Sequence, residues 1–188
     1  MLSNGLLAIL VMINIVEHTS KNYSPRTKLN ASLGDLTVAF YVDHTTAGER
    51  LTCSAAGRNY VSISICDTPV TDAVKIIYGA MCIRNAFTLN IAGNGMYTLH
   101  KFGIDQQFVN EYILSIVRSV HCHRPISEIF SGGQTGADLA GIVTAQVLGI
   151  NATMTMPKGY IQRFEDKKDI VQTKKDIESQ IAFWANKL

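Results

Sequence analysis

The sequence predicts a single α/β domain of Rossmann-like architecture: a doubly wound, mostly parallel sheet with helices on both faces. The first observation is an alternation of β-branched or aromatic runs with segments of helical periodicity along the chain. The second is that polar, mostly glycine-bearing turns follow three of the expected strands, at residues 45–50, 93–95 and 132–138. The third is composition, because 47% hydrophobic and 17% charged residues describe a globular chain with a sizeable core.

The chain divides into an amino-terminal extension, residues 1–11, and a single domain, residues 12–188. The apolar run from Leu6 to Val16 is too short to cross a membrane, and it lacks the basic flank and cleavage site of a signal peptide. A formal net charge of +2 is too small to indicate a nucleic-acid partner by itself. We therefore expect a cytoplasmic protein with neither a membrane nor a nucleic-acid partner.

The first half of the chain is expected to form three strands, at residues 12–16, 36–42 and 60–65. The pair Ser24-Pro25 places a proline in a first helical turn, which predicts a short helix through residues 28–30. Helical spacing then predicts further helices that end at Gly57 and that span residues 71–83.

The second half continues the alternation, with strands expected at residues 87–92, 126–130 and 152–156. Apolar residues recur at helical spacing over residues 106–120, and an apolar helix is expected over residues 139–148. A last helix is expected after Thr173, which forms a capping box with Asp176. Its apolar side holds Ile177, Ile181 and Trp184.

The turn at residues 131–138, Ser-Gly-Gly-Gln-Thr-Gly-Ala-Asp, is the central motif of the chain. Its adjacent glycines allow a tight turn and the close approach of a ligand to the backbone. Ser131 or Thr135 is suited to cap the helix that follows. The free N–H groups and the positive end of that helix then suit a phosphate or another anion, although a plain strand–helix turn has the same pattern.

The four cysteines, Cys53, Cys66, Cys82 and Cys122, are far apart and have apolar neighbours, so we expect reduced and mostly buried thiols. His121-Cys122-His123 invites a metal interpretation, but no second ligand cluster accompanies it, and histidines at a helix carboxyl end explain it equally. We expect neither a metal nor a cofactor.

The central motif, the small-residue helix behind it and Pro157-Lys158-Gly159 resemble the molybdenum carrier-like proteins of the YpsA branch of the SLOG superfamily. Residues 36–52 resemble the middle strand and turn of that family, and residues 89–93 resemble its late strand. Both precede Ser131 here, so the resemblance implies a circular permutation relative to the carriers. It covers roughly residues 26–159.

The chain departs from the family pattern at three positions. Leu139 and Tyr160 stand where the family has arginine, and Ala47-Gly48-Glu49 replaces Gly-Gly-Thr. What the resemblance implies is the binding of a nucleotide or a nucleotide-derived signal, of the ADP-ribose or cyclic nucleotide type. It further implies a phage protein that sequesters a bacterial immune signal in the host cytoplasm. It also implies a homo-oligomer, for which Ile181 and Trp184 offer apolar surface.

The residues expected to bind this ligand come from the turns after the strands. One phosphate is expected on the backbone N–H groups of Gly132, Gly133, Gln134, Thr135 and Gly136, next to Ser131. A second phosphate is expected at Thr45, Thr46 and Gly48. The opposite wall is expected from Gly93, Asn94 and Gly95. Asn90 or Asp138 is expected to bond a ribose hydroxyl, and Lys158 or Arg163 to neutralise charge.

The rival hypothesis is an enzyme, an N-glycosidase that acts on nucleoside phosphates. That chemistry needs a carboxylate near the ribose, for which Glu49 and Asp138 are the candidates, with Arg50 as a phosphate clamp. Plain capping explains both carboxylates as well, since Glu49 follows Thr45 and Thr46 as in a capping box and Asp138 lies in a first helical turn. A third hypothesis is an interaction protein with vestigial glycine turns.

Overall fold

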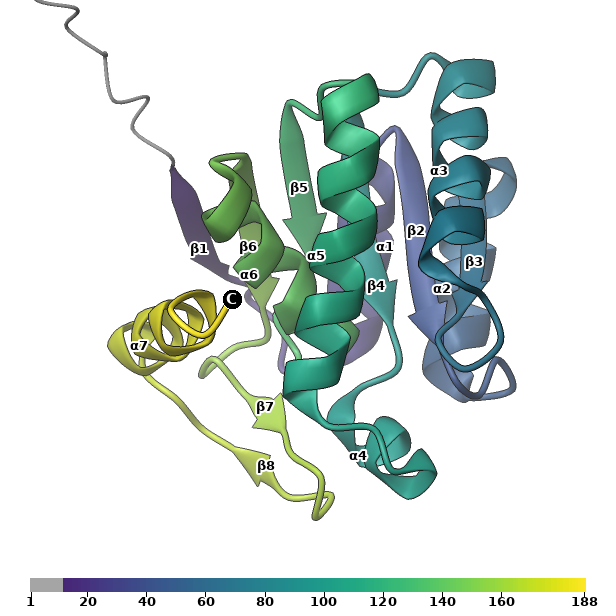
Figure 1. Cartoon of the computed structure of the whole chain (residues 1–188). Helices are drawn as coiled ribbons and strands as arrows, with labels where there is room; N and C mark the ends of the chain where they lie inside the picture. The colour runs from purple at the N-terminus through teal and green to yellow at the C-terminus, as the bar shows by residue number, and fades with distance from the viewer. Residues whose placement is uncertain (1–11) are drawn as a thin grey trace, which may run out of the picture.

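The structure is a computed structural model that describes residues 12–188, so the expected extension at residues 1–11 lies outside the described residues. A six-stranded parallel sheet lies between two layers of helices, which confirms the predicted fold class (Figure 1). The strands are β1 (Ile13–Glu17), β2 (Leu36–Tyr41), β3 (Tyr60–Ser64), β4 (Thr88–Gly93), β5 (Glu128–Ser131) and β6 (Asn151–Met156). The helices are α1 (Tyr23–Leu33), α2 (Ala47–Ala56), α3 (Val70–Arg84), α4 (Met96–Leu99), α5 (Gln106–His123), α6 (Ala137–Leu148) and α7 (Lys174–Ala185).

The strands lie in the order β1-β6-β5-β4-β2-β3. Helices α1 and α2 pack side by side on one face, and α3, α5 and α6 cover the other (Figure 1). From β2 the chain moves outward to β3 at one edge, whereas from β4 it moves through β5 and β6 toward the other edge. The direction of winding therefore reverses between β2 and β4, and such a switch point opens a crevice at the carboxyl ends of the strands.

The core lies between the sheet and its helices. Leu36, Val38 and Phe40 of β2 are buried, as expected for a β-branched and aromatic strand in the middle of a parallel sheet. The ring of Phe40 meets the edge of Tyr112 on α5, with 6.2 Å between the ring centroids. Beside it, Gly93 has a φ of +146°, and a Cβ there would lie 1.9 Å from the Phe40 carbonyl oxygen. Glycine at the end of β4 thus lets β2 and β4 approach each other at the switch point.

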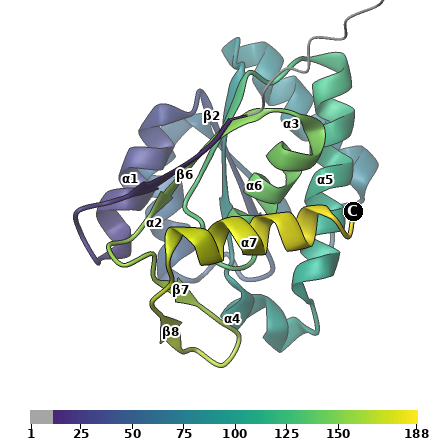
Figure 2. The same cartoon turned by 90° about the vertical axis from the view of Figure 1, so that its left-hand side faces the viewer.

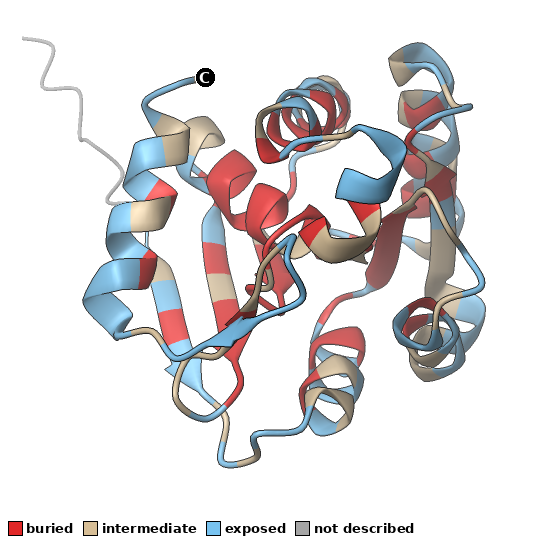
Figure 3. Cartoon of the chain, turned by 90° about the horizontal axis from the view of Figure 1, so that it is seen from below, coloured by how far each residue is buried: buried red, intermediate tan, exposed pale blue. Residues whose placement is uncertain are grey.

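Two short elements at the carboxyl edge of the sheet are absent from the sequence prediction. One is α4, which follows β4 and continues into a 3-10 turn at His100–Phe102. The other is the antiparallel hairpin of β7 (Gln162–Arg163) and β8 (Asp169–Ile170), which extends over this edge and whose strand β8 is exposed (Figure 3). Helix α7 follows the hairpin and packs on α6 (Figure 2). Its predicted capping box between Thr173 and Asp176 is present.

Three sequence expectations are wrong. All four cysteines are exposed, because Cys53, Cys82 and Cys122 lie on the outer faces of their helices while apolar neighbours such as Met81 face the sheet. Ile181 is buried in the core, so it offers no apolar surface to a partner, and Trp184 is half-buried against that core. Ser131 and Thr135 do not cap α6, whose N-cap residue is Gly136.

Among residues 12–188, no helix is long and apolar enough to cross a membrane.

Candidate functional site

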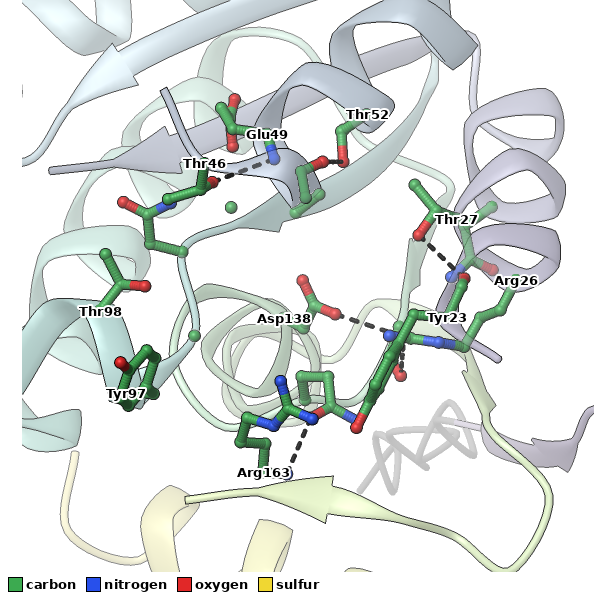
Figure 4. A pocket seen from close by; sticks show the side chains of 18 of the residues that line it. Tyr23, Arg26, Thr27, Thr46, Glu49, Thr52, Tyr97, Thr98, Asp138 and Arg163 are labelled. Carbon is green, nitrogen blue, oxygen red and sulfur yellow. Dashed lines mark hydrogen bonds and ion pairs between the residues drawn. The ribbon is translucent and has the colours of Figure 1, made fainter. Parts of the chain in front are cut away.

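A cavity of about 240 Å³ lies at the switch point, between α1, α2 and the face of β4 (Figure 4). The turns after β4 and β5 close it at the carboxyl edge, and Arg163 of the hairpin reaches it from outside. The lining contains eleven residues that the sequence singled out: Thr46, Gly48, Glu49, Asn90, Gly93, Asn94, Gly95, Gly132, Gln134, Asp138 and Arg163. It also contains Tyr23, Arg26, Thr27, Asn30, Thr52, Ala92, Tyr97 and Thr98.

An ion pair between Arg26 and Asp138 forms part of the cavity wall. Arg26 Nη1 lies 3.4 Å from Asp138 Oδ2, and the two side chains are only 5% and 13% exposed. The same nitrogen donates to the carbonyl oxygen of Gly132. Burial raises the pKa of Asp138, and the Arg26 guanidinium opposes that rise. Helix α1 thus supplies a guanidinium beside the motif, although the residue after Asp138 is the buried Leu139.

The arrangement also explains the first glycine of the central turn. A Cβ at Gly132 would lie 1.7 Å from Arg26 Nη1 and 2.3 Å from Asp138 Oδ2. A side chain at this position would therefore displace the ion pair. Because Gly132 has no side chain, the Arg26 guanidinium has room to form the ion pair in the cavity wall.

Glu49 is the second carboxylate of the site and comes from the first turn of α2. Its backbone N–H donates to Thr46 Oγ1 at 3.2 Å, as the capping prediction expects. Its side chain, however, does not complete a capping box, because Oε1 accepts a hydrogen bond from the Tyr60 hydroxyl. Burial raises the pKa of Glu49, the bond from Tyr60 opposes the rise, and the charge of Asp138 adds to it. The two carboxylates are therefore close enough to interact.

Four buried polar atoms on residues that line the cavity have no hydrogen-bond partner in the described part of the chain. They are Arg26 Nε, Asn30 Oδ1, Glu49 Oε2 and Asn90 Oδ1. Only three other side-chain atoms of residues 12–188 share this property, so the unpartnered atoms concentrate here. Asn90 is otherwise held by a bond from its Nδ2 to Thr37 Oγ1 at 3.2 Å. Buried polar atoms are ordinarily paired, and a cluster of exceptions around one cavity indicates a place for a ligand.

The polar groups in the rest of the central turn form hydrogen bonds with other residues of the chain. The Gly136 N–H, expected to hold phosphate, donates to Gln106 Oε1 at 2.6 Å. Thr135 Oγ1 donates to the Arg163 carbonyl oxygen at 2.5 Å. Ser131 Oγ is buried and lies 2.8 Å from the carbonyl oxygens of both Ile91 and Asp138. Gly133 faces the sheet, where a Cβ would lie 2.1 Å from Met156 Sδ. The expectation of a phosphate on the Gly136 N–H is therefore wrong.

Gln134 lines the cavity and also fixes the hairpin. Its Nε2 donates to the Ile161 carbonyl oxygen at 2.7 Å, and its Oε1 accepts from the Arg163 N–H at 2.9 Å. The amide thus pairs with the backbone of the hairpin as a neighbouring strand would. Gln162 adds a bond from its Nε2 to the Gly133 carbonyl oxygen at 2.8 Å. The central turn is therefore the anchor of the hairpin.

The wall at Gly93, Asn94 and Gly95 is where the sequence places it, but the Asn94 side chain is bonded to the protein backbone. Its Oδ1 accepts from the N–H groups of Val42 and Asp43, and its Nδ2 donates to the Asp43 carbonyl oxygen. Asn94 therefore fixes the turn between β2 and α2, on which Thr46 and Glu49 depend, and it contributes to the site by positioning that turn.

Outside the central turn, three further expected ligand residues are absent from the cavity lining. Thr45 is bonded to Asp43 Oδ1 through both its N–H and its hydroxyl. Arg50 donates to the Thr45 carbonyl oxygen and lines a separate hollow with His44 and Tyr60. Lys158 follows β6, and its N–H donates to the Ser20 carbonyl oxygen. Arg163 does reach the cavity, but its guanidinium forms a double ion pair with Asp169, with both N–O distances at 2.8 Å.

Most residues that the sequence prediction missed come from α1 and α4. Figure 4 shows Tyr23, Arg26 and Thr27 at the right of the cavity, Thr46, Glu49 and Thr52 at its top, and Tyr97 and Thr98 at its left. One signal in the sequence could have found α1, because polar Arg26 and Asn30 recur at a spacing of four and mark one face of the expected helix. Helix α4 has four residues and shows no periodicity.

The fold and the cavity define an α/β protein with a cavity at the switch point of a parallel sheet. Among residues 12–188, no group of three or more histidine, cysteine, aspartate or glutamate side chains could hold a metal ion. No model of a known protein family matches this chain. No curated protein is similar to it either.

Proposed function

We propose that this cavity binds a nucleotide or a nucleotide-derived signal molecule, either an ADP-ribose-type ligand or a cyclic nucleotide. The observation that carries the proposal is the set of unpartnered polar atoms on Arg26, Asn30, Glu49 and Asn90. Each buried polar atom without a partner costs about 1–3 kcal/mol. A ligand that satisfies these atoms recovers that energy as affinity.

The chemistry of these atoms favours a ligand with many hydrogen-bond donors. Three of the four are acceptor oxygens, on Asn30, Glu49 and Asn90. The hydroxyls of a ribose and the amine of a base are such donors. An ionised phosphate offers only acceptors, and it would be repelled by Glu49 and Asp138. The enclosed part of the cavity therefore suits the sugar or base of a nucleotide, in contrast to the phosphate that the sequence places at the central turn.

The size of the cavity indicates that it encloses only part of the proposed ligand. Sites that enclose a drug-sized ligand have volumes of about 300–1,000 Å³, and this cavity has about 240 Å³. A nucleoside-sized part fits inside while the remainder extends through the opening, where Tyr23, Tyr97 and Arg163 lie. The resemblance to SLOG proteins supports a signal-type ligand, and on that basis we propose sequestration as the biological role.

A second candidate function is hydrolysis of the N-glycosidic bond of the same ligand. Glu49 favours it, because one oxygen is fixed by Tyr60 while Oε2 is unpartnered in the wall, and burial raises the pKa of the carboxyl. Such a carboxyl is suited to proton transfer, while the anionic Asp138 would stabilise positive charge on the sugar. Binding remains the first proposal, since it needs only the unpartnered atoms.

Incubation with a panel of nucleotides separates the two candidates. The protein is mixed with nucleoside 5′-monophosphates, ADP-ribose and 3′,5′-cyclic nucleotides, recovered by gel filtration, denatured, and the released ligand is analysed by chromatography. Intact ligand supports binding alone. Free base or sugar phosphate supports hydrolysis, which Glu49→Gln should abolish. Failure of every member of the panel to co-elute or to raise the melting temperature contradicts both candidates.

A further inference from the structure

The side chains of Lys101 and Lys167 both lie near the ring of Tyr97, where α4 approaches the hairpin at the edge of the cavity. Tyr97 of α4 lines the opening. Lys101 Nζ lies 3.9 Å from the centroid of the Tyr97 ring, and Lys167 Nζ, from the turn of the hairpin, lies 5.1 Å from it. The nearby Lys101 and Lys167 lower the pKa of Tyr97. We call these three residues the lysine clip.

The positive charge of the lysine clip is not neutralised within the described residues. Neither Lys101 nor Lys167 forms an ion pair there, whereas Arg163 is paired with Asp169 and Lys168 with Asp166. Asp43 is near enough to sense the charge of Lys101, but its carboxylate is engaged by the N–H and hydroxyl of Thr45. Two like charges held at one phenol repel each other, and a dianionic group between them would relieve that repulsion.

The backbone of the hairpin turn favours a different residue at position 167. Lys167 has a φ of +67°, a left-handed conformation that costs a non-glycine residue about 1 kcal/mol and that glycine adopts freely. A hydrogen bond from its N–H to the Phe164 carbonyl oxygen closes the turn. The turn thus presents a lysine side chain where its geometry suits glycine, directly at the opening of the cavity.

Resting on the proposed function, we propose that Lys101 and Lys167 bind the 5′-phosphate of a ligand whose ribose lies inside the cavity. The enclosed wall presents acceptor oxygens for hydroxyls, and the opening presents free cations for phosphate. A 3′,5′-cyclic phosphate is fused to the ribose, so its charge would stay inside, next to Glu49 and Asp138. The ligand class is therefore an open 5′-nucleotide or an ADP-ribose-type molecule, and cyclic 3′,5′-nucleotides are disfavoured.

Titration calorimetry tests this assignment with the common ribonucleosides, their 5′-monophosphates, their 3′,5′-cyclic monophosphates and ADP-ribose. We expect a 5′-monophosphate to bind about tenfold more tightly than its nucleoside, and the cyclic form no more tightly than the nucleoside. In the variant Lys101→Gln/Lys167→Gly this ratio should fall to about one, with the affinity for the nucleoside unchanged. Glycine suits the backbone at 167, so the variant should fold.

Lys168→Gln is the matched control, because Lys168 is the neighbouring lysine of the same turn but is paired with Asp166. It should preserve the preference for the 5′-monophosphate. If nucleosides bind but the phosphate preference is missing, or survives in the Lys101→Gln/Lys167→Gly variant, the lysine assignment is wrong and the cavity assignment stands. If no member of the series binds, both are wrong.

Discussion

Arg26 and Asp138 lie 112 positions apart in the chain and form a buried ion pair in the cavity wall. The pair has two roles, because it balances the buried carboxylate of Asp138 and it fixes the guanidinium beside the Gly132 carbonyl oxygen. Breaking a buried pair at one partner leaves an uncompensated charge, which is more costly than removing both partners.

Arg26→Met should therefore lower the free energy of unfolding by about 3 kcal/mol, because Asp138 is left buried without its counter-charge. Arg26→Met/Asp138→Asn should recover a large part of that loss. Urea denaturation of wild type, both single variants and the double variant gives the coupling energy of the pair. Strict additivity of the two substitutions would contradict the buried-pair interpretation.

Glu49 makes the stability of the protein depend on pH. Its pKa is raised in the folded state, so above the ordinary value of 4.5 the folded chain binds more protons than the unfolded chain. The free energy of unfolding then falls as the pH rises through the raised pKa. Asp138, whose pKa is also raised, adds to the same decline.

Glu49→Gln should make this decline shallower, since glutamine does not titrate and its carbonyl oxygen still accepts from Tyr60. Each unit by which the pKa is raised is equivalent to about 1.4 kcal/mol, so the variant should equal or exceed wild type in stability above neutral pH. Urea denaturation from about pH 4 to about pH 8 measures this profile. Parallel profiles for the two proteins would show that Glu49 has an ordinary pKa.

Part of the site could be predicted at the level of residues. Glu49 and Asp138 follow strands of a parallel sheet and Asn90 lies within β4, and the carboxyl ends of such strands share one edge. The spacing of Arg26 and Asn30 marks one face of a helix, but it does not show that this face reaches the site, because the place of the helix over the sheet depends on strand order. The uses of Thr135 and Gly136 were also beyond prediction, because their partners, the Arg163 carbonyl and Gln106, are set by tertiary packing.

Among the elements, the β7–β8 hairpin is the one whose attachment the structure explains most directly. Its backbone is bonded by the side chains of Gln134 and Thr135, and Gln162 returns a bond to the Gly133 carbonyl oxygen. The hairpin carries Arg163 and Lys167 to the opening of the cavity. The turn at residues 131–138, which resembles a phosphate-binding loop in sequence, therefore anchors the hairpin.

Gln134→Ala should loosen the hairpin without unfolding the domain. The Arg163 N–H loses its acceptor, so its hydrogen exchange should accelerate by about tenfold or more, while the core strands keep their protection. Amide exchange followed by NMR measures both. Gln107→Ala is a suitable control, because Gln107 bonds only its helical neighbour Glu111. Unchanged exchange at Arg163 in Gln134→Ala would show that other contacts hold the hairpin.

Element prediction succeeded where apolar periodicity is long and failed where it is short. The strand expected at residues 36–42 and the helix expected at residues 106–120 appear as β2 and α5 within a few residues. Helix α4 and the hairpin have too few residues for a pattern, and tertiary hydrogen bonds stabilise them instead. The cysteine prediction failed for a related reason, since apolar neighbours in sequence can lie on the opposite face of a helix.

For the molecule as a whole, the alternation of strands and helices predicts a parallel sheet but leaves strand order undetermined. The structure places β1 at one edge beside β6, so the connection through α1 crosses back over β6, β5 and β4. That crossing puts Arg26 and Asn30 beside α2 and the end of β4, and the cavity exists because of it. The site is thus a product of topology more than of any one motif.

We propose that the unpartnered polar atoms of this cavity bind a nucleotide-derived ligand. The substitution Asn30→Leu tests this proposal at a single residue. The Asn30 side chain makes no hydrogen bond in the described structure, and its buried Oδ1 is unpartnered. Thr144→Val is the matched control, because it removes another unpartnered buried atom that lies away from the cavity. Neither substitution should lower the free energy of unfolding appreciably.

The decisive measurement is titration calorimetry of ADP-ribose and of the 5′-monophosphates into wild type, Asn30→Leu and Thr144→Val. We predict one ligand per chain in wild type, an affinity about tenfold or more weaker in Asn30→Leu, and an unchanged affinity in Thr144→Val. Equal affinities in wild type and Asn30→Leu, or no binding by wild type, would contradict the assignment of this cavity as the ligand site.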